Sequence, residues 1–169
     1  QLIGVVDHGL ATSHRNGPVA YKIHPTVAPR LQRTNPRPAA PPPLPGTLRV
    51  VSVNVQNYFT TLHDGAHRCG PRHTSADCRG ATSEAEFARQ QAKVLAMLAA
   101  LNADVIVLLE IENNGADAAT ALAAALSRHA HAPGAVGDVL AADVRAYRAI
   151  TAAQPGSDAI QVALLYQPA

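Results

Sequence analysis

Two apolar segments, Leu48–Val53 and Asp104–Glu110, place the strongest constraint on how this chain folds. Both are rich in Val, Ile and Leu and have the length of a single strand, so each is predicted to be a strand buried on both faces. A helical pattern lies between them, and a strand–helix–strand order implies a right-handed crossover between two parallel strands. We therefore expect an α/β fold built around this parallel pair.

The segment between the two strands carries helix signals at both ends. Ser83-Glu84-Ala85-Glu86 has the pattern of a capping box with Ser83 as the N-cap, and Asn102 is expected to end the helix. Hydrophobic residues at helical spacing predict a face that packs on the sheet, and polar residues are expected to face away from it. The first group is Phe87, Val94, Leu95, Leu98 and Leu101, and the second is Arg89, Gln90 and Lys93.

Polar side chains occur at the carboxyl end of each predicted strand. Asn54 and Asn57 follow the first strand, and Glu110, Glu112 and Asn113 end the second strand or follow it. Carboxyl ends of parallel strands meet at one edge of a sheet, where open α/β sheets build their sites. Asn54 and Glu110 are therefore expected to lie close enough to share a cation. The alternative is that Glu110 is merely the first solvated residue beyond a strand.

The rest of the chain divides into segments of different character. Residues 1–24 carry loosely alternating apolar residues around a turn-like HRNGP, and we interpret them as two strands from the end of an upstream β domain. Residues 25–46 hold most of the prolines and are predicted to be a stiff, extended linker. Residues 47–169 form the α/β region. Its further predicted elements are a helix at 117–129 and strands at 145–151 and 159–166.

Charge is divided unevenly along the chain. Residues 1–50 contain six Lys or Arg against one acidic residue, whereas residues 51–169 contain eight against eleven. The basic first part favours contact with a polyanion, and the acidic remainder favours binding of a cation. No apolar run is long enough to span a membrane. The chain begins within a strand pattern and shows no secretory signal, so we expect that an N-terminal part is missing.

Both cysteines lie in a long polar loop, residues 60–82. Cys69 and Cys78 are expected to form a disulfide, which would imply an oxidising compartment. The alternative is a zinc site formed by the two cysteines together with His63 and His67. Against zinc, the cysteines lack the close Cys-x2–4-Cys spacing that is typical of zinc-binding modules.

Four segments of the chain occur in the order found in a known family: LRVVSVNVQNYFTT, CRGATSEAEFARQQAKV, ADVIVLLEIENNG and GSDAIQVALLY. Together they resemble the secreted nuclease branch of the endonuclease/exonuclease/phosphatase superfamily, which includes the DNase I-like enzymes. The resemblance runs from about Leu48 to the end of the chain. It implies the first half of an α/β sandwich of two packed mixed sheets with helices outside.

The resemblance also implies a chemistry and the residues that perform it. The family hydrolyses phosphodiesters with a hard divalent cation that is held by few oxygen ligands. The expected cation is Mg²⁺, and the alternatives are Mn²⁺ and Ca²⁺. Asn54 matches the asparagine that orders the phosphate and the metal, and Glu110 matches the glutamate that binds the metal. Both are assigned as catalytic and metal-binding residues. Asn57, Glu112 and Asn113 match positions that support the site.

The superfamily's later motifs, which carry a His–Asp pair and an Asp-x-Asn pair, have no match in this chain. We therefore expect an incomplete, inactive fragment of a secreted, extracellular nuclease that lacks the C-terminal half of the catalytic domain. The partner of the full-length protein would be DNA or RNA, with no membrane span. Two alternatives stay open: a phosphatase or phospholipase of the same superfamily, and a non-catalytic half domain that binds a partner chain.

Overall fold

The structure is a computed structural model of the chain, and it describes residues 1–12, 16–32, 34, 38, 42–43, 45–75, 77–130, 146–153 and 156–168. The chain divides into two compact units, residues 1–39 and residues 40–169. Among the described residues, the first unit contains two strands. The second contains four strands, two α-helices and a short 3-10 helix.

The first unit is an antiparallel hairpin. Strand β1 (Gly4–Leu10) pairs with β2 (Val19–Pro25), from Gly4 opposite Pro25 to Leu10 opposite Val19. The two strands predicted within residues 1–24 are therefore present. Their large apolar side chains are exposed, because a single hairpin has no second layer to cover either face.

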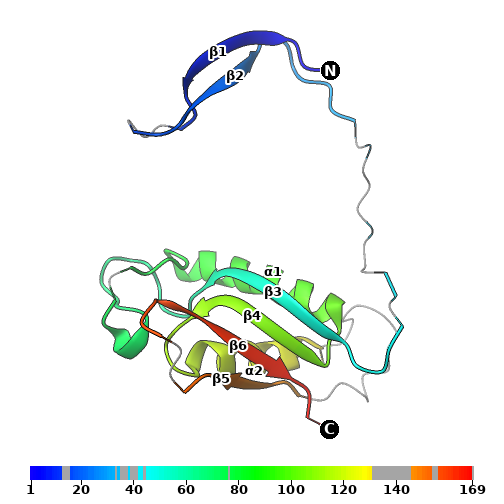
Figure 1. Cartoon of the computed structure of the whole chain (residues 1–169), viewed down its shortest axis with the longest axis vertical. Coiled ribbons are helices and arrows are strands. Elements are labelled where there is room, and N and C mark those ends of the chain that lie inside the picture. The colour runs from blue at the N-terminus through cyan, green and yellow to red at the C-terminus, as the bar shows by residue number, and fades with distance from the viewer. Residues whose placement is uncertain are drawn as a thin grey trace. The chain divides into compact units, whose positions relative to one another are not determined.

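A four-stranded mixed sheet forms the centre of the second unit (Figure 1). Its strands are β3 (Val50–Tyr58), β4 (Val105–Glu112), β5 (Arg148–Thr151) and β6 (Ile160–Tyr166), in the order β3-β4-β6-β5. β3 and β4 are parallel, as the strand–helix–strand order predicts, and β6 is antiparallel to both of its neighbours. The unit therefore has an α/β fold, as expected.

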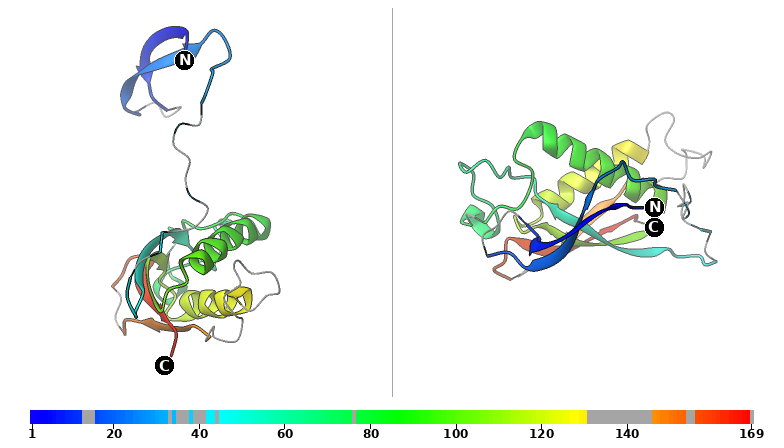
Figure 2. Two further views of the ribbon diagram at one scale, coloured as in Figure 1. Left: turned by 90° about the vertical axis from the view of Figure 1, so that its right-hand side faces the viewer. Right: turned by 90° about the horizontal axis from the view of Figure 1, so that it is seen from above.

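Both α-helices pack on the same face of this sheet (Figure 2). α1 (Glu84–Leu101) contacts β3, and α2 (Asp117–Ala130) contacts β4, β5 and β6. The hydrophobic core lies between the helices and the sheet, and its burial holds β3 and β4 side by side. Its fully buried members include Tyr58, Leu98, Ile106, Leu108, Leu122, Leu126 and Leu165.

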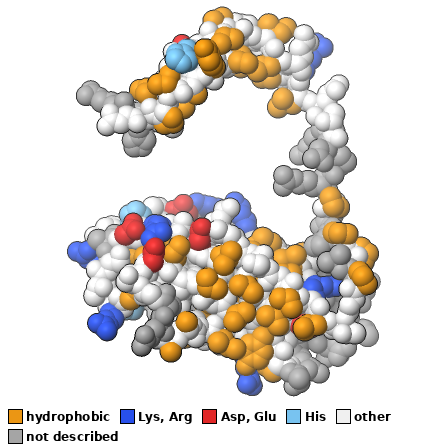
Figure 3. Space-filling view, viewed as in Figure 1, with side chains coloured by type: hydrophobic (Ala, Val, Ile, Leu, Met, Phe, Trp, Pro, Cys, Tyr) orange, Lys and Arg blue, Asp and Glu red, His pale blue; other side chains and the backbone are white. Residues whose placement is uncertain are grey.

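The opposite face of the sheet carries apolar side chains that no described residue covers. Figure 3 views this face and shows hydrophobic side chains gathered over the strands. The exposed fractions are 56% for Val50, 53% for Val162, 50% for Ile150 and 36% for Leu109. The prediction that the strands are buried on both faces is therefore wrong for the described part of the chain, where they are buried on the helical face only.

α1 begins and ends at the predicted residues. Ser83 is the N-cap, and its hydroxyl accepts a hydrogen bond from the backbone N–H of Glu86 at 3.3 Å. Asn102 ends the helix in a left-handed conformation with φ 42°, and its backbone N–H bonds to carbonyl oxygens of the last turn. The Glu86 carboxylate departs from a capping box, because it accepts hydrogen bonds from Thr82, one residue before the N-cap.

Candidate functional site

Both β3 and β4 are irregular near their carboxyl ends. The β3–β4 register shifts between Asn54 and Tyr58, and Gln56 and Asn57 there have left-handed φ angles of 52° and 54°. Glu110 on β4 is also left-handed, with φ 62°, where the β4–β6 register shifts. Non-glycine residues pay about 1 kcal/mol or more for this conformation, which clusters at functional sites. The backbone strain therefore surrounds the residues that are predicted to form the site.

The two strand ends bring Asn54 and Glu110 into contact. The Asn54 amide donates a hydrogen bond from Nδ2 to Glu110 Oε1 at 2.7 Å. Its oxygen, Oδ1, accepts from the backbone N–H of Gln56 at 2.7 Å, and these two bonds orient the amide. The described residues provide no hydrogen-bond partner for Glu110 Oε2, so this oxygen is available to a ligand.

A glutamine of α1 holds the irregular part of β3. Gln90 Nε2 donates to the carbonyl oxygens of Gln56 at 3.1 Å and Asn57 at 3.4 Å, two of the three residues that have no partner in the β3–β4 ladder. The described hydrogen bonds of Asn57 thus involve its backbone. Gln91 donates to the hydroxyl of Tyr58 at 2.8 Å, and burial raises the pKa of that phenol. The expectation that Gln90 faces away from the sheet is wrong, because the irregular strand turns unpaired carbonyl groups toward α1.

Glu112 is fully buried behind the strand ends. Its Oε2 accepts four hydrogen bonds at 2.9–3.1 Å: from the backbone N–H and the hydroxyl of Thr60, from the backbone N–H of Thr61 and from Asn114 Nδ2. Its other oxygen, Oε1, is buried without a partner in the described part of the chain. A buried carboxylate needs such donors to replace its lost hydration. Glu112 therefore ties the loop after β3 to the end of β4.

Asn113 connects the end of β4 to the segment that precedes β6. It is buried, its Nδ2 donates to the carbonyl oxygen of Asp158 at 2.8 Å, and its backbone N–H bonds to Ala159 at 2.8 Å. The Asp158 carboxylate pairs with Arg79 from the loop before α1, and the hydrogen bond from Arg79 lowers the pKa of that carboxyl. Asn113 and Asp158 thus position the backbone around the site.

The loop between β3 and α1 is closed by a disulfide between Cys69 and Cys78, as expected. The loop includes the short helix η1 (Pro71–His73). The disulfide packs in a small cluster with Phe59, which is fully buried. Gly80 lies against the same side chain, and a Cβ atom at position 80 would overlap Phe59 Cβ. The loop therefore packs on the residue that directly follows β3.

The alternative zinc site lacks its sulfur ligands, because Cys69 and Cys78 are bonded to each other. His67 pairs instead with Asp64, with 2.7 Å between His67 Nδ1 and Asp64 Oδ2. Hydrogen bonds from the backbone N–H groups of His67 and Ala66 lower the pKa of Asp64 to about 2. Among the described residues, no three His, Cys, Asp or Glu side chains are grouped to hold a metal ion.

The oxygen donors at the strand ends fit a hard divalent cation. Glu110 provides a carboxylate oxygen, and Asn54 Oδ1 keeps one lone pair beyond the bond that it accepts from Gln56. Carboxylate and amide oxygens are ligands that Mg²⁺ prefers, and Mg²⁺ keeps several waters, so it needs few protein ligands. A cation here would be bound by these two side chains and by water.

Comparisons of the chain with protein-family models, curated proteins and solved structures find no match. No helix in the described ranges is long and apolar enough to cross a membrane. The structure establishes the class of the second unit, an α/β domain with a mixed sheet. Its assignment to a superfamily depends on the four sequence segments alone.

Proposed function

We propose that this chain carries the metal- and phosphate-binding part of a secreted, Mg²⁺-dependent phosphodiesterase that hydrolyses nucleic acid. One observation carries the proposal: Asn54 Nδ2 lies 2.7 Å from Glu110 Oε1, at the carboxyl ends of two parallel strands. These are also the two residues that match the phosphate- and metal-ordering positions of the resembled family. The disulfide between Cys69 and Cys78 is compatible with an oxidising compartment.

The two residues have different roles in this proposal. Glu110 binds the cation through Oε2, the oxygen without a partner among the described residues. Asn54 holds the other carboxylate oxygen in place through Nδ2 and offers Oδ1 as a second ligand, and Gln56 in turn fixes the Asn54 amide. When bound, Mg²⁺ polarises the phosphate and stabilises the charge that develops on it.

The irregular backbone supports this site by limiting its motion. Gln90 binds both carbonyl groups of the left-handed pair Gln56–Asn57. The amide that orients Asn54 therefore belongs to a residue that is itself held by α1. A site assembled before substrate arrives needs little rearrangement during the reaction, which favours catalysis.

The first test measures metal binding by the chain itself, with Mn²⁺ as a paramagnetic substitute for Mg²⁺. Glu110→Gln should weaken Mn²⁺ binding by about tenfold or more, and Asn54→Ala by about tenfold, because partners that orient a metal ligand contribute about 10–100-fold. Glu84→Gln, which neutralises an exposed carboxylate at the start of α1, is the matched control. Equal Mn²⁺ affinity in Glu110→Gln and Glu84→Gln would exclude Glu110 as a ligand.

The second test measures hydrolysis in a polypeptide that also carries the superfamily's later motifs, which the resemblance implies for water activation. Glu110→Gln should lower the Mg²⁺-dependent cleavage of plasmid DNA or RNA by about 10²–10³-fold, the equivalent of about 3–4 kcal/mol of transition-state stabilisation. Cleavage by the unaltered protein should stop in EDTA. Turnover of phosphate monoesters or phospholipids without cleavage of DNA or RNA would assign the site to a phosphatase or phospholipase instead.

A further inference from the structure

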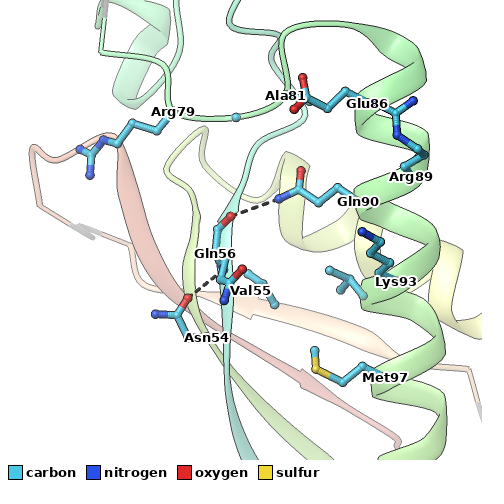
Figure 4. Close-up of a pocket in the computed structure, with 12 residues that line it drawn as sticks. Asn54, Val55, Gln56, Arg79, Ala81, Glu86, Arg89, Gln90, Lys93 and Met97 are labelled. Carbon is cyan, nitrogen blue, oxygen red and sulfur yellow. Dashed lines mark hydrogen bonds between the residues drawn. The ribbon is translucent and has the colours of Figure 1, made fainter. Parts of the chain in front are cut away.

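An open groove of about 510 Å³ runs between the edge strand β3 and α1 (Figure 4). Asn54, the residue that contacts Glu110, is among the β3 residues that line it, so the groove ends next to a residue of the proposed metal site. Figure 4 shows Gln90 and Lys93 projecting from α1 toward β3. The other residues of α1 in the lining are Glu86, Arg89, Val94 and Met97.

The groove carries an excess of positive charge. Three cations line it, Arg79, Arg89 and Lys93, together with a single carboxylate, Glu86. Arg79 is already paired with Asp77 and Asp158. Arg89 and Lys93 are exposed, and neither forms an ion pair with a described residue.

The remaining acid, Glu86, interacts with Arg89 through charge but lies away from Lys93. Both the backbone N–H and the hydroxyl of Thr82 donate to Glu86 Oε2, at 2.8 Å and 2.6 Å. This carboxylate is therefore engaged before the start of α1, and Lys93 lies two turns further along the helix. An anion that enters the groove meets Lys93 without displacing an internal partner, and it meets Arg89 beside Glu86, with which Arg89 interacts through charge.

The groove is elongated and has a mixed lining. From Glu86 to Met97 it follows α1 for about 16 Å, at a rise of about 1.5 Å per residue. Val55 and Val94 are buried in its floor, and Met97 is 39% exposed. Gln90 Oε1 is buried without a partner among the described residues. A positively charged groove that follows the backbone is one of the features by which proteins bind a single nucleic-acid strand, and here Met97 and the valines provide apolar surface in place of aromatic rings.

We propose that the groove between β3 and α1 binds one strand of the nucleic-acid substrate, with successive phosphates on Arg89 and Lys93 and a base or sugar against Met97. The two cations are four residues apart on α1, so their side chains are neighbours on one face of the helix. A small phosphate ester or a lipid headgroup needs only one anion site and would leave most of this length unused. The substrate class in this inference rests on the proposed function.

The test measures binding of a fluorescent dT12 oligonucleotide to the full chain by anisotropy, in EDTA so that no metal-dependent reaction contributes. The variant Arg89→Gln/Lys93→Gln is compared with Arg68→Gln/Arg128→Gln, which removes the same charge from exposed positions outside the groove. At 50 mM salt the groove variant should bind about tenfold more weakly than the control variant. Its log–log salt slope should fall by about 1.4, the value for two lost contacts to single-strand phosphates. Far-UV circular dichroism checks that both variants are folded.

Three results would overturn the inference: no binding of dT12 by the unaltered chain, affinities of the two variants within twofold of each other, or equal displacement of dT12 by inorganic phosphate at the same phosphate concentration. The last result would indicate a site for a free anion. Because binding is measured without metal, loss of dT12 affinity in the groove variant supports the groove even if Glu110 proves not to bind metal. Conversely, hydrolysis that depends on Glu110, together with equal dT12 binding by the two charge variants, would support the proposed function and overturn the inference about the groove.

Discussion

Thr60 donates two hydrogen bonds to the same oxygen of Glu112, from its backbone N–H at 2.9 Å and from its hydroxyl at 3.0 Å. The two residues belong to segments far apart in the chain, the loop after β3 and the end of β4. The carboxylate is completely buried, so water cannot replace it as an acceptor. This pair therefore anchors the loop that follows β3 to the end of β4.

Removal of the Glu112 carboxylate should destabilise the second unit. Glu112→Ala leaves the donors of Thr60, Thr61 and Asn114 unpaired, and we expect the free energy of unfolding to fall by about 3 kcal/mol or more. Glu112→Gln keeps an acceptor and should cost less. Denaturant unfolding measures both variants, and Glu84→Ala, at an exposed position, is the control. A loss below about 1 kcal/mol in Glu112→Ala would show that the network is not a structural anchor.

The Cys69–Cys78 disulfide should stabilise the fold by itself, with no metal ion bound to the two sulfur atoms. Replacement of both Cys69 and Cys78 by Ser should lower the free energy of unfolding by about 2–3 kcal/mol, because the closed loop is short. Intact mass measured without reductant should be lower by two hydrogens than the mass of the reduced chain. Recovery of two free thiols with stoichiometric zinc, from a purification without reductant, would restore the zinc alternative.

Asp64 should make stability depend on pH in the acid range. Its folded pKa is about 2, below the usual 3.8, chiefly because the backbone N–H of His67 donates to the carboxylate. A depressed carboxyl pKa stabilises the fold fully above about pH 4, and this contribution is lost as the pH falls toward 2. Thermal unfolding of the unaltered chain and of Asp64→Asn should therefore differ at pH 5–6 and converge near pH 2. A difference that stays constant across this range would contradict the assigned cause.

The uncovered face of the sheet should make the chain associate. Val162 and Ile150 are about half exposed, so we expect binding of the dye ANS and a concentration-dependent increase in size by light scattering. Val162→Lys and Ile150→Lys should reduce both effects with little change in unfolding free energy. Leu31→Lys, at a position that is 91% exposed in the first unit, is the control. A monodisperse monomer without ANS binding would contradict this expectation.

The elements that sequence alone predicts well are those with local signals. Ser83 and Asn102 bound α1 because capping depends on residues within one turn, and the structure places both as predicted. The contact between Asn54 and Glu110 follows from topology, since parallel strands end at the same edge. Only the chain order of two strands and a helix is needed for that inference.

The features that escape prediction arise from contacts between distant segments. Gln and Glu rarely adopt left-handed angles, so nothing in the sequence marks Gln56 or Glu110 as irregular. From the sequence alone, Gln90 is predicted to be a solvated residue on the polar side of a helix, because its backbone partner arises only from the irregularity in β3. Residue periodicity likewise cannot show which face of a sheet is covered, because an apolar side chain looks the same on either face.

The close approach of Gly80 to Phe59 has a consequence for how this sequence can change. Phe59 fills its cluster completely, and any side chain at position 80 would occupy the same space. Every residue except glycine carries the Cβ atom that would be overlapped, so a smaller side chain at position 59 would not make room for a larger residue at position 80. In chains that share the fold we therefore expect glycine at position 80 whether or not position 59 keeps its aromatic ring.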